Sequence, residues 1–122
     1  MARDVHRILG FSIAAGWTLL FLAGATLAIR KRPAGRFYWS LLAVLQVALG
    51  LQVVAGLVVF ASGGRPPALH YVYGVVVPAL LLVEAHVFAP RLDGLPKHAL
   101  FTTAAFINLF LALRAIQTGL GL

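Results

Sequence analysis

The sequence predicts an all-α integral membrane protein, built as an antiparallel four-helix transmembrane bundle. The 122 residues are 61% hydrophobic and only 11% charged, and the mean hydropathy is +0.96, whereas a water-soluble domain needs far more polar surface. The apolar residues also form four runs, each near the length of about 20 residues that crosses a bilayer. We expect one domain, residues 1–122, with helices at about 5–29, 37–61, 68–89 and 98–120.

The first run, residues 8–29, carries no charge. Arg3 and Arg7 precede it, as basic residues precede the apolar part of a signal peptide. The run is longer than such an apolar part, which spans about 7 to 15 residues. We therefore expect a retained membrane helix.

The other three runs are almost as free of charge. Residues 37–64 carry none, Glu84 is the only charged residue within 69–89, and Arg114 alone interrupts 99–122. Links rich in proline, glycine and cations separate the four runs at residues 30–36, 62–67 and 90–97. Such short links require consecutive helices to run antiparallel.

This topology sorts the cations between the two ends of the bundle. End A, where the first and third helices begin, holds Arg3, Arg7, Arg65 and Arg114. End B holds Arg30, Lys31, Arg32, Arg36, Arg91 and Lys97. Because the cytoplasmic side carries the excess of Lys and Arg, we expect a multi-pass protein of the cell membrane with end B in the cytoplasm and both termini extracytoplasmic.

Composition also limits the classes of partner and cofactor that we expect. The net charge of +7 is explained by cations that flank helix ends beside lipid headgroups, so we expect the lipid bilayer and no nucleic acid as partner. The chain has no cysteine, which excludes a disulfide, a thiolate ligand, an iron–sulfur cluster and covalent c-type haem. Any haem must be held by histidine or by Met1, the single methionine.

A repeated His-x-x-x-Gly pattern is the main functional signal. It occurs as His6 with Gly10 and as His70 with Gly74, at the start of the first and third helices. Residues i and i+4 share a helix face, so the imidazole can reach an iron while the glycine leaves room for a porphyrin. These helices lie diagonally across the bundle, where bundles place cofactors. We predict one haem b per chain, with His6 and His70 as iron ligands; the alternative is an interfacial histidine beside an ordinary packing glycine.

Arg114 lies near the same end. It could bind a haem propionate, or it could extend to the interface or pair with Asp4. On the second helix, Gln46, Gly50, Gln52 and Gly56 are typical of helix packing. We expect substitution of Gly56 to perturb folding more than haem.

A second haem would need His86 and His98 near end B, which are weaker candidates. His70 and His86 are sixteen residues apart, or about 160° around a regular helix, and His98 has Thr102 instead of glycine at i+4. We expect a single haem.

Glu84 follows His70 by fourteen residues and so falls on nearly the same face of a regular helix. We expect its carboxyl group to point into the bundle. An intramembrane carboxyl group is a functional candidate, for proton transfer, for quinone binding, or for a structural hydrogen bond to Gln46 or Asn108.

The stretches His6-Arg7-Ile8-Leu9-Gly10 and Arg30-Lys31-Arg32, then Leu45-Gln46-Val47-Ala48-Leu49-Gly50 and His70, resemble one four-helix half of haem A synthase. The resemblance covers about the first 75 residues. That family has eight helices in two halves, each with a histidine pair and with its first histidine helix beginning outside the cytoplasm. The resemblance implies that His6 and His70 are paired haem ligands and that a homodimer would restore eight helices.

The chain departs from this family at the catalytic motif, because the glutamate three residues before the histidine is Arg3 here. The resemblance therefore implies a stand-alone haem-binding relative rather than a haem A synthase. We expect a b-type cytochrome-like protein, a possible oxidoreductase, for electron transfer or haem handling. The alternatives are a cofactor-free accessory subunit of a larger respiratory or assembly complex and a small proton-coupled exporter using Glu84.

Overall fold

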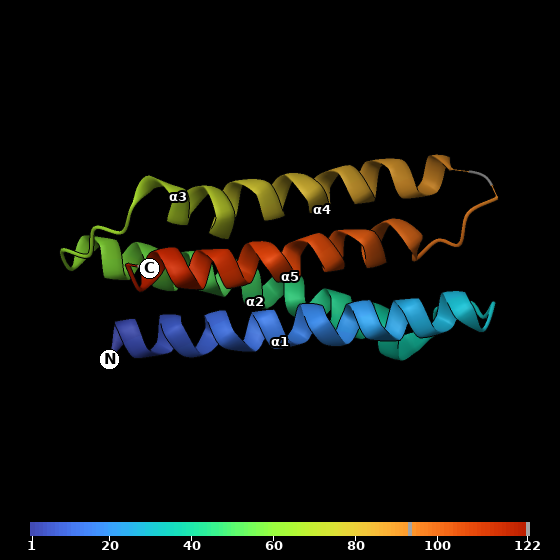
Figure 1. Cartoon of the computed structure of the whole chain (residues 1–122), viewed down its shortest axis with the longest axis horizontal. Helices are drawn as coiled ribbons and strands as arrows, with labels where there is room; N and C mark the ends of the chain where they lie inside the picture. Colours follow the sequence, from blue (N-terminus) through green and yellow to red (C-terminus); the bar gives the residue numbers. More distant parts are fainter. Residues whose placement is uncertain (93, 122) are drawn as a thin grey trace.

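The computed structural model describes residues 1–92 and 94–121, and this part of the chain forms four roughly parallel helical rods without a strand (Figure 1). The first, second and fourth rods are α1 (Ala2–Ile29), α2 (Arg36–Ala61) and α5 (Ala99–Gly119). The third rod is composite and consists of α3 (Ala68–Tyr71), η1 (Val72–Val76), α4 (Val77–Phe88) and η2 (Ala89–Arg91). The predicted all-α four-helix bundle is confirmed.

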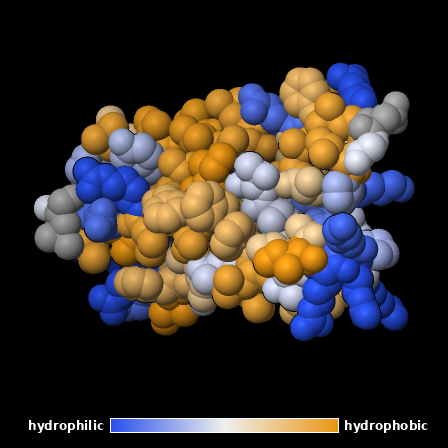
Figure 2. Space-filling view, turned by 45° about the vertical axis from the view of Figure 1, so that its right-hand side comes forward, coloured by the Kyte–Doolittle hydropathy of each residue, from blue (hydrophilic) through white to orange (hydrophobic). Residues whose placement is uncertain are grey.

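The outer surface of the bundle is suited to lipid. All four rods are long and apolar enough to span a membrane, and large apolar side chains such as Val47 and Leu57 are exposed on the outside. Figure 2 shows an apolar belt with hydrophilic residues at both ends. The chain is therefore a multi-pass membrane protein, and both of its termini lie at end A (Figure 1).

The rods pack unequally. α1 contacts α2 and α5 along much of its length, and the third rod packs mainly on α5, so α1 and the third rod are diagonal partners. Glycines allow the close contacts of α1: Gly24 lies directly against Thr102 of α5, and Gly16 lies against Leu45 of α2. Small residues of this kind let membrane helices approach closely. The fold is thus held most tightly around α1.

The third rod contains a π-helical turn, η1, directly after α3. Pro78 follows this turn, has no backbone N–H and would clash with the carbonyl of Gly74 in a regular α-helix. A π-turn accommodates the defect by inserting one extra residue. The insertion rotates everything beyond it by about 100° relative to His70.

This rotation corrects the expectation for Glu84. On a regular helix Glu84 would lie about 40° from His70, whereas the inserted residue increases the angle to about 140°. Its side chain is exposed on the outside of the bundle and makes no hydrogen bond to Gln46 or to Asn108. The same rotation reduces the angle between His70 and His86 from about 160° to about 60°.

The contact between α1 and α5 gives a stability prediction. A Cβ atom at Gly24 would overlap the side chain of Thr102, whose hydroxyl is 2.8 Å from the Tyr38 hydroxyl. Gly24→Ala should lower the free energy of unfolding by about 1–3 kcal/mol, as overpacking does. Gly50→Ala is the matched control, because nothing lies within 4 Å of its Cβ position. Thermal unfolding in detergent, followed by circular dichroism, measures both, and equal midpoints would contradict the packing described.

Candidate functional site

The structure brings together His6 of α1 and His70 of α3, the two histidines of the repeated pattern. Their ring centroids are 5.9 Å apart, and the ring planes are inclined by 59°. Both side chains are partly buried inside the bundle near end A. They meet because α1 and the third rod are diagonal partners that begin at the same end.

A hydrogen bond orients the His70 ring. Its Nδ1 atom lies 2.8 Å from the carbonyl oxygen of Ala115 on α5. A carbonyl can only accept, so Nδ1 carries the proton and donates it, and Nε2 keeps a free lone pair. Metal-ligating imidazoles have this arrangement, in which the second nitrogen donates to a backbone carbonyl or a carboxylate.

Each ring also lies against a glycine of a neighbouring helix. A Cβ atom at Gly56 of α2 would be 3.1 Å from Cε1 of His6, and one at Gly119 of α5 would be 2.9 Å from Cε1 of His70. Gly56 therefore contacts a histidine ring directly, because α2 runs antiparallel to α1 and returns to end A beside His6. Gly119 was not singled out from the sequence, since a glycine near a chain end has no distinctive pattern.

The glycines of the repeated pattern have different neighbours. The Cβ position of Gly10 faces Nε2 of Gln52 at 3.2 Å, and that of Gly74 faces the Cβ of Ala115 at 3.6 Å. Both residues line the same cavity as the histidines. Gly10 and Gly74 thus contribute to helix packing and to the cavity wall together.

That cavity has a volume of about 760 Å³ and opens at end A, within the range of about 300 to 1,000 Å³ that is usual for ligand sites. Arg3, Arg7 and Arg65 line it. Arg114 is exposed, lies outside the lining, and donates from Nη1 to Oε1 of Gln117 at 3.1 Å. Asp4 pairs with the terminal amino group at 3.4 Å. The cations nearest the histidines are therefore those of α1 and of the link before α3.

Several buried polar atoms around the cavity have no partner within the described residues. They are His6 Nδ1, Gln52 Oε1 and both amide atoms of Asn108. Asn108 is completely buried and lies seven residues from Ala115, about 10 Å deeper along α5. Unpaired polar groups are costly in an apolar interior, so the cavity is chemically incomplete by itself. An asparagine in the middle of an apolar run was the sequence signal for this position.

The two remaining histidines occupy separate environments. His86 donates from Nδ1 to the carbonyl of Leu82 at 2.7 Å, which leaves Nε2 to accept from the amide of Gln46 at 3.2 Å. Its ring packs on Phe101. His98 is buried at the start of α5, where its ring packs on Tyr38. The rings of His86 and His98 thus pack against different residues.

His6 and His70 are the residues of this site that could hold a metal ion or the iron of a haem. Within the described residues, no three or more His, Cys, Asp or Glu side chains converge, whereas a structural zinc site uses four protein ligands. A haem would need only these two histidines from the chain, because the porphyrin would supply the other bonds to iron. No protein-family model matches the chain, and no curated protein or solved structure is significantly similar to it.

The Ala115 contact predicts the tautomer of His70. In haem-free protein labelled with ¹⁵N-histidine, we expect Nδ1 to be protonated and Nε2 to be unprotonated, because the carbonyl of Ala115 holds the Nδ1 proton. Nitrogen chemical shifts distinguish the two forms, and the signal lost in His70→Ala assigns the residue. A protonated Nε2 on neutral His70 would contradict this geometry.

Proposed function

We propose that this chain is a membrane b-type cytochrome-like protein that binds one haem between His6 and His70. The closeness of the two imidazoles is the observation that supports this proposal most strongly. Two imidazoles bound to one iron would each have a metal–nitrogen bond of about 2 Å, and each ring centroid lies about 1 Å beyond its nitrogen. The two centroids would therefore be roughly 6 Å apart. The two rings here are 5.9 Å apart.

The surrounding residues have matching roles in this proposal. His6 and His70 would hold the iron, and the Ala115 carbonyl orients His70. Arg3 and Arg7 at the cavity mouth are suited to pair with propionate carboxylates. A bound haem supplies one-electron redox chemistry. If both His6 and His70 held the iron, the chain would leave no free position there for a substrate, which favours electron transfer or haem handling over oxygen chemistry.

The proposal includes an orientation in the cell membrane. End B carries the larger number of cations, six against four at end A, which favours a cytoplasmic end B. The cavity mouth and both termini would then be extracytoplasmic. The resemblance to one half of haem A synthase agrees with this orientation. Arg3 at the position of the catalytic glutamate argues against that enzymatic activity.

The exporter alternative receives no support from the position of Glu84. The side chain is exposed on the outside of the bundle and does not line the His6–His70 cavity. The partner is proposed only as a class: a membrane quinone, a second copy of the chain, or a respiratory or assembly complex. Haem content separates the cytochrome from a cofactor-free accessory subunit.

The first test is the absorption spectrum. Protein expressed with sufficient haem should show the Soret and α bands of a low-spin b-type cytochrome, because two imidazoles form a strong-field axial pair. A pyridine haemochrome assay should give one haem per chain. Absence of a Soret band would refute the proposal, and two haems per chain would indicate a further site at His86 and His98.

Histidine variants test the ligands individually. His6→Ala and His70→Ala should each reduce haem retention at least tenfold, because each removes one of only two protein bonds to iron. His86→Ala is the matched control: it removes a histidine that hydrogen-bonds to Leu82 and Gln46 outside the His6–His70 cavity. Haem per chain after purification is the measurement. Equal losses in all three variants would show that the haem ligands are misassigned.

A further inference from the structure

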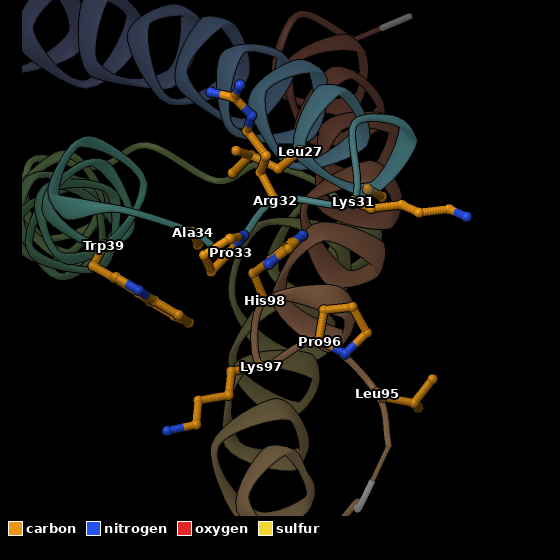
Figure 3. A pocket seen from close by; sticks show the side chains of 11 residues that line it. Leu27, Lys31, Arg32, Pro33, Ala34, Trp39, Leu95, Pro96, Lys97 and His98 are labelled. Atoms are coloured by element: carbon orange, nitrogen blue, oxygen red, sulfur yellow. The ribbon is translucent and has the colours of Figure 1, made fainter.

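A second pocket lies at end B and takes no part in the proposed haem site. Its volume is about 630 Å³, and it lies between the end of α1, the start of α2 and the segment before α5. We call it the end-B pocket. Its lining, shown in Figure 3, includes Leu27, Lys31, Arg32, Trp39, Lys97 and His98. Two properties of this lining indicate a ligand. They are an unpaired buried imidazole and a set of cations.

The imidazole belongs to His98. Its side chain is 2% exposed, and its Nε2 atom has no hydrogen-bond partner within the described residues. In Figure 3 the ring lies at the centre of the pocket, between the loop that carries Pro33 and the segment that carries Pro96. The Tyr38 hydroxyl, 3.2 Å from the His98 carbonyl, anchors the residue. An unpaired polar atom in this position is costly, and a partner placed in the pocket, an acceptor where Nε2 carries the ring proton, would remove that cost.

The cations indicate that the acceptor is an anion. Lys31, Arg32 and Lys97 line the pocket, and none of the described residues that line it carries a carboxylate. Lys31 and Lys97 extend to opposite sides of His98 in Figure 3. In addition, α5 begins beside this pocket without a side-chain cap, and the positive end of its dipole favours an anion nearby.

The remaining walls favour an anion attached to a lipid. Leu27, Leu95 and Trp39 form apolar parts of the lining, and tryptophan is typical of the membrane interface. A free phosphate would gain nothing from these walls, whereas a phospholipid presents its phosphate next to acyl chains. Basic pockets between transmembrane helices bind anionic headgroups in this way. We infer that the end-B pocket binds the phosphate of an anionic phospholipid, which accepts a hydrogen bond from His98 and pairs with Arg32 and Lys97.

A phosphate can reach His98 only after a small local change in the pocket. The Nε2 atom of His98 has almost no solvent-exposed surface, so a phosphate oxygen reaches it only when the loop between α1 and α2 shifts slightly. Arg30, Lys31, Arg32 and Pro33 of this loop are exposed. Their side chains make no hydrogen bond to the rest of the described chain. The backbone N–H groups of Lys31 and Arg32 do donate to carbonyls at the end of α1, so the shift involves the loop side chains and the backbone after Arg32.

Native mass spectrometry of the full chain tests this inference without reference to haem. The protein is released from micelles that contain equal amounts of phosphatidylglycerol and phosphatidylcholine, and the retained lipids are counted. We expect one phosphatidylglycerol to be retained in preference to phosphatidylcholine. Removing a cation near an anionic headgroup should lower this preference about fivefold, so Arg32→Gln with Lys97→Gln should nearly abolish it.

The control is Arg30→Gln with Arg91→Gln, which removes the same charge from exposed residues at end B that do not line the pocket. This pair should keep the preference. His98→Gln retains a donor and should also keep most of it, whereas His98→Phe should lose it. Equal retention of both lipids, or equal losses in the two double variants, would overturn the inference. So would displacement of phosphatidylglycerol by millimolar inorganic phosphate, which would indicate a site for a free anion.

Discussion

The bilayer restricts where polar groups of this chain can lie, and the rest of the structure follows from that restriction. Lipid cannot hydrogen-bond to polar side chains or to the backbone, so polar residues are favoured at the two ends or inside the bundle; Glu84, exposed on the outside of the third rod, is an exception. Most cations lie at the two ends. Other polar residues lie inside the bundle and line one cavity, among them His6, His70, Gln52 and Asn108. The apolar exterior therefore concentrates the chemistry of the chain in its interior.

The unequal packing of the rods creates the space for that chemistry. Gly16 and Gly24 bring α1 against α2 and α5, while the third rod leans mainly on α5. Two imidazoles on diagonal rods can then face each other with neither rod in close backbone contact. Gly56 and Gly119 complete the arrangement, because larger residues there would displace the rings. Glycines thus have two roles in this bundle. Some allow α1 to pack closely on α2 and α5, and others leave room for the two histidine rings.

The two ends of the molecule have different chemistry. End A holds the imidazole pair and a large cavity, whereas end B holds a smaller pocket with three cations and the buried imidazole of His98. Since α1 spans the whole distance between them, the proposed haem and the inferred lipid site are separated by about a membrane thickness. Each can be tested without the other.

The sequence by itself determined the fold class, the approximate helix limits and the pairing of His6 with His70. These follow from hydropathy, short links and antiparallel order, which are local or topological properties. The tertiary structure alone decided the direction of Glu84, because a π-turn before Pro78 rotates the later part of the third rod. It also decided that Gly56 and Gly119 contact the histidine rings and that Arg114 lies outside the cavity. Those contacts join residues of different helices, and no spacing along one helix encodes them.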